Sequence, residues 1–279
     1  MLPNRFHCSL FVIHFHYSLS HMEVRAKKGL GQHFLRDHQI AADIVDALLM
    51  GDRTKVLEVG PGMGVLTRFL LQKKELETTV VELDRESVSY LKSNLPELGG
   101  RIVEGDFLQM DLKANYSTTP FSLIGNFPYN ISSQILFKVL ENKELIPEVV
   151  GMLQKEVAER ICHGPGSKTY GILSVLLQAW YKTEYLFTVN EDVFDPPPKV
   201  KSAVIRLTAN GRTELGCSEK LFKAVVKQAF NQRRKMLRNS IKSFTPRYDE
   251  LDAHTLTRRP EQLSVEEFIV LTNAIEKLL

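Results

Sequence analysis

The stretch Lys55-Val56-Leu57-Glu58-Val59-Gly60-Pro61-Gly62-Met63-Gly64 decides the fold of this chain. A short β-type run leads into glycines at alternate positions, and residues 65–71 then show the apolar spacing of a helix. Glycine lets the backbone turn tightly and approach a ligand closely, because it carries no Cβ. The unpaired N–H groups and positive dipole end of the following helix attract polar ligand groups. The stretch therefore predicts a strand, a ligand-binding turn and a helix, with Gly60 and Gly62 beside the ligand.

The spacing of the glycines separates two kinds of nucleotide-binding turn. The dinucleotide fingerprint needs glycines at the first, third and sixth places. Counted from Gly60, the sixth place is Val65, and counted from Gly62, it is Thr67. The fingerprint therefore fails in both registers. The chain instead shows acid-x-Gly-x-Gly-x-Gly, which is the pattern of enzymes that bind S-adenosylmethionine.

Acidic residues stand at the ends of the next two expected strands. Glu82 lies near the end of the strand expected over 78–84, where a carboxylate can accept both hydroxyls of a ribose. Asp106 follows the strand expected over 101–104 and is placed to accept from an adenine amino group, with Phe107 as an apolar neighbour. Open α/β sheets bind ligands at these strand ends. The alternatives are a solvated Glu82 before a helix and a simple turn role for Asp106.

A further motif, Asn126-Phe127-Pro128-Tyr129, ends the apolar run at 121–125. The side-chain oxygen of Asn126 and a backbone carbonyl near Pro128 can both accept hydrogen bonds from one amino group on a planar heterocycle. Pro128 stiffens the loop because its φ is fixed, and Tyr129 offers a ring face for stacking. These groups predict a catalytic site for an exocyclic amino group. The alternative is a strand-to-helix turn without chemistry, since Asn and Pro are common turn residues.

The order of β-type and helical runs predicts the fold class. The two alternate as far as about residue 208, and the last two β-type runs cover 184–189 and 200–208. This order predicts a mostly parallel, doubly wound, Rossmann-like α/β sheet with an antiparallel hairpin at its end. Asn210-Gly211 marks the expected domain boundary. The expected segments are an extension of no assigned function at 1–21, a methyltransferase domain at 22–209 and a small all-helical domain at 210–279.

Basic residues gather in the expected helical domain. The net charge of the whole chain is only +3, which by itself does not indicate a nucleic-acid partner. Residues 220–248, however, hold nine Lys or Arg and no Asp or Glu. Phosphate neutralisation supplies most non-specific affinity for RNA, so an RNA partner is favoured over a merely solvated helix surface. The candidate RNA-binding residues are Lys223, Lys227, Arg233, Arg234, Lys235 and Arg238.

Cysteine usage and hydropathy indicate the compartment. The three cysteines, Cys8, Cys162 and Cys217, are far apart and odd in number, so neither a metal site nor a disulfide framework is expected. A reducing cytoplasm is therefore the expected location. The apolar run at 10–13 is too short to span a membrane, and no membrane partner is expected.

The motifs together resemble one enzyme family. From about Lys27 to the carboxyl end, the chain resembles the ribosomal RNA adenine dimethylases, in their bacterial small-subunit (16S) form. The resemblance rests on the motifs above and on two further stretches, residues 28–35 and 194–204. The family more often has Asn at the position of His33 and Leu at the position of Phe127.

The resemblance implies a function and further site residues. His33 and Leu35 would belong to the amino-terminal cofactor motif, and Phe194 would stack on the target base opposite Tyr129. The implied reaction transfers methyl groups from S-adenosylmethionine to N6 of two adjacent adenosines in a small-subunit rRNA hairpin, within an immature 30S particle. The enzyme is expected to act as a monomer.

Two other functions stay open at this point. One is a different amino-group methyltransferase, acting on DNA adenine, large-subunit rRNA or a protein glutamine. The basic helical tail disfavours the glutamine substrate. The other is a non-catalytic ribosome assembly factor, which the intact glycine loop, Glu82, Asp106 and Asn126 disfavour.

Overall fold

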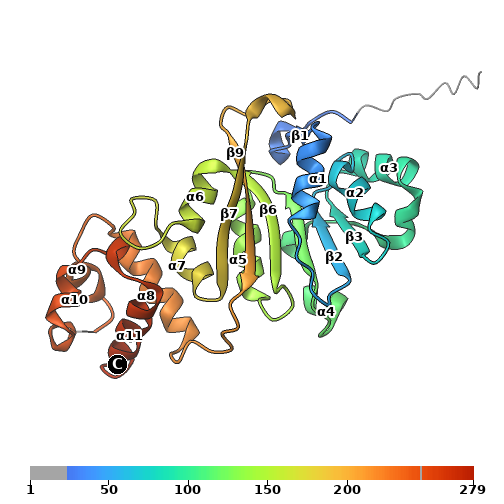
Figure 1. Ribbon diagram of the computed structural model, residues 1–279. Helices are drawn as coiled ribbons and strands as arrows, with labels where there is room; N and C mark the ends of the chain where they lie inside the picture. The colour runs from blue at the N-terminus through green and yellow to red at the C-terminus, as the bar shows by residue number, and fades with distance from the viewer. Residues whose placement is uncertain (1–23, 246) are drawn as a thin grey trace, which may run out of the picture.

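A seven-stranded sheet forms the centre of the molecule (Figure 1). The computed structural model describes residues 24–245 and 247–279, so the expectations for residues 1–21 lie outside the described residues. The strand order is β4-β3-β2-β5-β6-β9-β7. The strands, in that order, are Ile102–Glu104, Glu77–Glu82, Lys55–Val59, Ser122–Asn126, Glu148–Gln154, Ser202–Ala209 and Tyr181–Val189.

The directions of the strands confirm the predicted fold class. Every neighbouring pair from β4 to β6 is parallel, whereas β9 runs antiparallel to both β6 and β7. The predicted hairpin is therefore present, although its second strand, β9, is inserted between β6 and β7. The chain passes from β2 outward to β3 and β4 and then returns to place β5 on the other side of β2. Such a reversal is where open α/β sheets bind their ligands.

Helices cover both faces of the sheet because successive strand residues point to opposite faces. Val56, Ile124 and Val150 share one apolar core with helices α1 (His38–Asp46) and α2 (Val65–Gln72). Leu57, Leu123 and Val149 lie in the core on the opposite side. Helices α5 (Ser132–Glu141), α6 (Lys155–Cys162) and α7 (Ile172–Gln178) pack there. Helix α3 (Arg85–Asn94) covers a smaller cluster near β3, and α4 (Leu112–Tyr116) precedes β5.

A two-stranded ribbon that the sequence did not predict lies beside the sheet. Strand β1 (Phe34–Leu35) pairs antiparallel with β8 (Phe194–Asp195). Each strand has only two residues, so neither shows a periodicity that could have been recognised. An ion pair between Arg36 and Asp195 also joins the two segments. The ribbon brings residues near position 33 next to residues near position 196.

The carboxyl-terminal part of the chain is helical and continues the core of the sheet. Its α-helices are α8 (Glu219–Asn231), α9 (Leu237–Ile241), α10 (Ala253–Thr257) and α11 (Val265–Glu276). The sequence spacing in α8 predicts one apolar helix face, and its five residues are all buried: Phe222, Val225, Val226, Ala229 and Phe230. These side chains belong to the same core cluster as α5 and α7. Figure 1 shows the four helices at one end of the molecule and α2 and α3 at the other. Within the described ranges, no helix is long and apolar enough to cross a membrane.

Phe127 occupies space that two glycines leave open on neighbouring strands. Its side chain is 1% exposed. A Cβ at Gly125 would lie 3.0 Å from the Phe127 ring, and a Cβ at Gly151 would lie 2.4 Å from it. The phenylalanine that departs from the family pattern is therefore packed against the backbone of β5 and β6. This packing fixes the path of the Asn126–Tyr129 loop.

We expect Gly151→Ala to destabilise the protein by about 1–3 kcal/mol, because the new methyl group overlaps a ring that cannot move within a closed core. The free energy of unfolding, measured by chemical denaturation, tests this. Gly164→Ala is the matched control, since a Cβ at Gly164 meets no atom within 4 Å. Equal stability of the Gly151→Ala variant and the parent would mean that the ring is not confined by these strands.

Candidate active site

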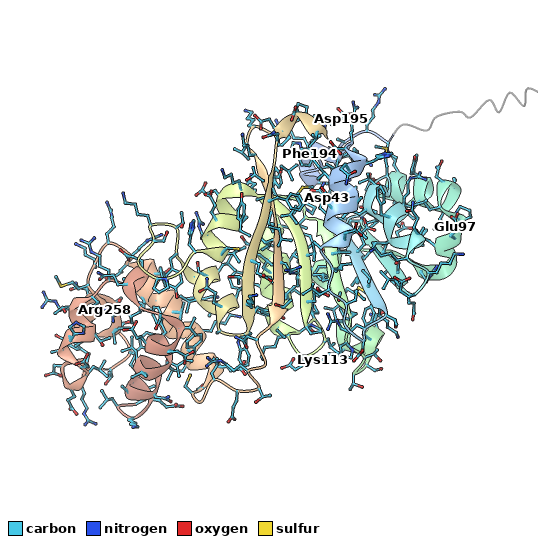
Figure 2. All side chains as sticks on the ribbon, viewed as in Figure 1. Asp43, Glu97, Lys113, Phe194, Asp195 and Arg258 are labelled. Carbon is cyan, nitrogen blue, oxygen red and sulfur yellow. The ribbon has the colours of Figure 1, made fainter. Side chains whose placement is uncertain are left out.

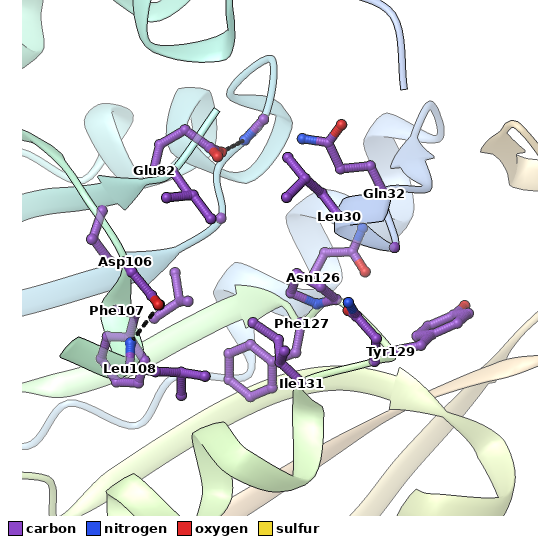
Figure 3. A pocket seen from close by; sticks show the side chains of 18 of the residues that line it. Leu30, Gln32, Glu82, Asp106, Phe107, Leu108, Asn126, Phe127, Tyr129 and Ile131 are labelled. Carbon is purple, nitrogen blue, oxygen red and sulfur yellow. Dashed lines mark hydrogen bonds between the residues drawn. The ribbon is translucent and has the colours of Figure 1, made fainter. Parts of the chain in front are cut away.

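One pocket opens at the carboxyl ends of the strands that flank the chain reversal (Figure 3). Its walls come from the segment before β1, the glycine loop after β2, the ends of β3 and β4, and the loop after β5. The predicted site residues that line it are His33, Gly60, Gly62, Glu82, Asp106, Asn126, Pro128 and Tyr129. Residues from five separate parts of the sequence therefore meet in one cavity, as the strand order requires.

The glycine loop is fixed by the carboxylate of Glu82. Glu82 Oε2 accepts from the Gly62 N–H at 3.0 Å, and Oε1 accepts from the Asp84 N–H at 2.9 Å. Gly62 has φ +56°, and a Cβ there would lie 2.8 Å from a ring carbon of Phe34. Burial raises the pKa of Glu82, while these backbone hydrogen bonds oppose that rise. Each carboxylate oxygen retains a further lone pair, which leaves capacity for ligand hydroxyls.

Asp84 caps helix α3, which follows β3. Its side chain accepts from the Glu86 N–H at the start of α3 and from the Ser87 hydroxyl. Lys27 Nζ lies 2.5 Å from Asp84 Oδ1 and 3.1 Å from Glu86. The capping function and the candidate ligand function therefore belong to different acids, and the amino-terminal segment is held against the end of β3.

The wall that holds Asp106 is supported by a lysine that the sequence motifs did not reveal. Asp106 Oδ1 accepts from the Leu108 N–H at 2.8 Å, which caps a short 3₁₀ helix (Phe107–Gln109). Lys138 Nζ, on α5, donates to the carbonyls of Leu108 at 2.9 Å and Met110 at 2.6 Å. It also lies 5.5 Å from the centroid of the Phe107 ring. Burial lowers the pKa of Lys138. No local pattern marks a single lysine in a helix as the support of a segment 30 residues away.

The orientation of the Asn126 amide follows from its partner. Asn126 Nδ2 donates to the backbone carbonyl of His33 at 2.9 Å. A carbonyl can only accept, so the NH2 group must face His33 and Oδ1 must point elsewhere. Asn126 ends β5 and is only partly buried, and it lines the pocket. Its side-chain oxygen is thus available as an acceptor beside the glycine loop, as the catalytic prediction needs.

Tyr129 is held at its ring and at its hydroxyl. Its ring stacks on His33 with centroids 5.3 Å apart and an interplanar angle of 29°. Its hydroxyl lies 2.5 Å from the Ser202 hydroxyl. His33 Nδ1 lies 2.7 Å from the carbonyl oxygen of Pro196. His33 therefore makes a polar contact, but through its ring to the 194–198 segment, and it stacks in a way that asparagine could not.

Leu35 and Phe194 lie outside this pocket. They are opposite each other in the β1–β8 ribbon, with exposed fractions of 4% and 3%, and belong to the core that contains α1 and α2. The ring of Phe194 is covered by this packing, so a base cannot reach its face unless the ribbon moves. Leu35 does line a smaller pocket, together with Gly60, Gly62 and Asn126. Stacking by Phe194 and cofactor contact by Leu35 both stay predictions.

The basic residues of the tail divide into two groups. Three of them are engaged within the molecule. Lys223 and Lys227 lie 5.8 Å and 5.5 Å from the centroid of the Phe137 ring, and Lys223 also lies 3.6 Å from Glu141. Arg233 donates to the backbone carbonyl of Lys168, which joins the tail to the 163–171 loop. The other three are exposed and form no ion pair with any described residue: Arg234, Lys235 and Arg238.

Glu58, the acid of the glycine motif, is buried below the loop. Its Oε2 accepts from the Thr67 hydroxyl at 2.6 Å, and this bond joins β2 to α2. Burial raises the pKa of Glu58 to about 8, and the nearby Glu82 adds to that rise. Protonated Glu58 thus places no second charge beneath Glu82 at neutral pH. Three or more potential metal ligands do not cluster anywhere in the described ranges.

We expect Glu82→Gln to weaken S-adenosylmethionine binding by about 1.5–3 kcal/mol, the usual range for a hydrogen bond to a charged group. Glutamine has one acceptor oxygen for two backbone donors, so the melting temperature of the cofactor-free protein should fall as well. Calorimetric titration and thermal unfolding measure the two effects.

Glu104→Gln is the control for this experiment, because Glu104 stands opposite Glu82 in the β3–β4 register and is exposed. It should leave the affinity unchanged. Parent-like affinity in the Glu82→Gln variant would remove Glu82 from the cofactor site.

The sequence of this chain is similar to those of known proteins. The family model described as ribosomal RNA adenine dimethylase matches residues 23–277. "Ribosomal RNA small subunit methyltransferase A" of Phocaeicola vulgatus is 62% identical over 257 residues, which cover 92% of this chain and 91% of the relative. The protein of that name from Bacteroides thetaiotaomicron is 63% identical over 257 residues, covering 92% and 96%.

Two solved structures share the fold. A dimethyladenosine transferase from Plasmodium falciparum has a TM-score of 0.72 at 23% identity, covering 88% of this chain and 98% of that one. The 23S rRNA methyltransferase ErmE has a TM-score of 0.65 at 25% identity, covering 87% and 99%. Because the family model spans nearly the whole described chain and relatives exceed 60% identity, the chain belongs to the ribosomal RNA adenine dimethylase family.

Proposed function

We propose that this protein transfers methyl groups from S-adenosylmethionine to the N6 amino groups of two adjacent adenosines in a small-subunit rRNA hairpin. The observation that carries the proposal is the Asn126 amide, whose oxygen is directed away from His33 in a pocket that also holds Glu82 and Tyr129. The names of the relatives at about 60% identity support the small subunit as the source of the RNA.

The pocket residues fit S-adenosylmethionine. Glycines at 60 and 62, with φ values of +67° and +56°, let a ligand approach the loop backbone closely. Glu82 would accept the ribose hydroxyls, and Asp106 retains acceptor capacity for the adenine amino group. When bound, this cofactor supplies a methyl group that its sulfonium already activates, so no covalent enzyme intermediate is required.

The task of the chain is to prepare the amino group that accepts the methyl. The N6 lone pair of adenine is delocalised into the ring. Acceptors at Asn126 Oδ1 and at the carbonyl near Pro128 would bind the two N6 hydrogens and favour a more tetrahedral nitrogen. Positive charge then develops on N6, and the same acceptors bind it more strongly than they bind the ground state. This is preferential stabilisation of the transition state.

The base must leave its stack to reach these acceptors, because N6 is not accessible to a reacting partner within a helix. Tyr129 lines the pocket next to Asn126 and offers a ring face on which an extruded base can stack. Such stacking contributes about 1–3 kcal/mol per base. Positioning of the amino group in line with the methyl supplies much of the remaining rate enhancement.

We place the reaction in the cytoplasm on an immature 30S particle, with the enzyme acting as a monomer. The second candidate reaction is methylation of adenine in large-subunit rRNA. The 25% identity to ErmE, a 23S rRNA methyltransferase, supports this alternative. Labelled methyl transfer to immature small subunits, large-subunit rRNA and DNA, measured side by side, distinguishes these substrates.

We expect Asn126→Ala to lower kcat by roughly a hundredfold or more, by analogy with the loss of one preorganised polar contact. RNA affinity should change much less, because phosphate contacts dominate it. Single-turnover methyl transfer with both ligands saturating isolates the chemical step. A variant that transfers methyl at the parent rate would make Asn126 a turn residue and overturn the proposed mechanism.

We expect Arg234→Gln, Lys235→Gln and Arg238→Gln together to weaken RNA binding and to reduce its salt dependence, by about one unit of slope for each phosphate that the tail no longer neutralises. The control neutralises Lys74, Lys92 and Lys113 instead. These are exposed and lie outside the tail, so the net charge changes equally. The same salt slope in both triple variants would mean that the tail's charges only face solvent.

A further inference from the structure

One buried hydroxyl contacts the outer end of the Tyr129 ring. We infer that Ser202 is a positioning residue for the target base, because it fixes the orientation of the ring on which that base stacks. Ser202 is not one of the residues that line the pocket, and neither the motifs nor the comparisons assign it a role. The inference rests on the proposed function, in which Tyr129 carries the stacked adenine.

Ser202 is itself held rigidly. It is the first residue of β9, is 0% exposed, and lies in the ladder between two neighbouring strands. The register places it opposite Gln154 of β6 and Val189 of β7. Its hydroxyl is 2.5 Å from the Tyr129 hydroxyl. A side chain as short as serine on a doubly paired strand has little freedom, so this contact joins Tyr129 to the centre of the sheet.

Three contacts together remove the freedom of the tyrosine. The Tyr129 carbonyl accepts from the Ser132 hydroxyl at 3.2 Å, at the start of α5. The His33 ring covers one face of the Tyr129 ring. The Ser202 hydroxyl holds the far end. The hydroxyl contact fixes the direction of the ring axis, and the stack on His33 opposes rotation of the ring about that axis. A base would then stack on the face opposite His33.

The orientation of this face matters for the reaction. Stacking alone tolerates sliding and rotation of a base, because every base has a π-face. Methyl transfer does not tolerate them, since a displacement of about 1 Å in the reacting atoms can cost roughly a hundredfold in rate. Burial raises the pKa of the Tyr129 phenol, so its hydroxyl remains protonated and able to share a hydrogen bond with Ser202 at neutral pH. A ring of fixed orientation therefore also fixes the position of the base that stacks on it.

The contact could instead serve only to satisfy two hydroxyl groups near the core. The two roles differ in what the variants should do. If Ser202 acts through Tyr129, removing either hydroxyl should produce the same defect, and removing both should add nothing further. If the bond is only structural, the variants should lose stability without a specific loss in the rate of methyl transfer.

The test is a double-mutant cycle with Ser202→Ala, Tyr129→Phe and the double variant. Single-turnover methyl transfer to immature small subunits is measured with saturating S-adenosylmethionine. We expect each single variant to be slower by about tenfold, the equivalent of one hydrogen bond, and the double variant to be no slower than either. Ser202→Thr, which keeps the hydroxyl, should restore most of the rate. Cofactor affinity, measured by calorimetric titration, should be unchanged throughout.

Ser122→Ala provides the control for loss of a buried serine. Ser122 is 0% exposed and bonds Glu148, at the start of β5 and β6, far from the pocket. It should lower stability without lowering the saturated rate. Parent-like rates in Ser202→Ala, or rate losses that multiply in the double variant, overturn the inference. If Ser202→Ala does not fold, the Tyr129→Phe variant removes the same bond from the other side. A parent protein that transfers no methyl would instead overturn the proposed function.

Discussion

The pairing of β2 with β5 is the constraint on which the rest of the structure depends. The two strands are parallel neighbours, with Leu57 opposite Leu123 and Glu58 opposite Ile124. They are separated in sequence by two complete strand–helix units. Their shared direction brings the glycine loop that follows β2 and the Asn126 amide that ends β5 to the same edge of the sheet. Both apolar cores form around this pair, because alternate residues of each strand point to opposite faces. Figure 2 shows the side chains of the sheet together with those of the helices around it.

The polar groups of the site hold one another before any ligand is considered. Glu82 holds the glycine loop through the Gly62 N–H, Asn126 holds the backbone at His33, and Lys138 holds the carbonyls that follow Asp106. Asn126 uses its NH2 group for His33 and leaves its Oδ1 for a ligand. Each carboxylate oxygen of Glu82 keeps a further lone pair after its backbone hydrogen bond. This arrangement makes the pocket preorganised, since acceptors are already directed when charge develops in the reaction.

The carboxyl-terminal helices contribute in two ways that sequence composition cannot separate. Their apolar side chains extend the core beneath α5 and α7, so this part of the molecule is packed on the sheet through a shared interior. Their basic side chains form two groups, those with contacts inside the molecule and those that are exposed. Lys223 and Lys227 lie near the ring of Phe137, and Arg233 reaches the 163–171 loop. Arg234, Lys235 and Arg238 remain exposed, and the electrostatic case for RNA rests on them.

The sequence by itself determined the features that depend on local periodicity and on short motifs. The strand–glycine–helix unit at 55–71, the apolar face of α8 and the doubly wound order of the sheet were all predicted, because local spacing encodes them. The positions of Glu82, Asp106 and Asn126 at the ends of their strands were also predicted, and these residues line one pocket. The tertiary structure alone decided which side chains support them. Lys138 and Ser202 lie 28 and 73 residues away from the groups they hold, at Met110 and Tyr129, and no local pattern marks them. Leu35 and Phe194 face each other in a two-residue ribbon, which is too short to show a periodicity in the sequence. Contacts between distant segments depend on how strands pair and helices pack, and a linear pattern of residues does not contain that information.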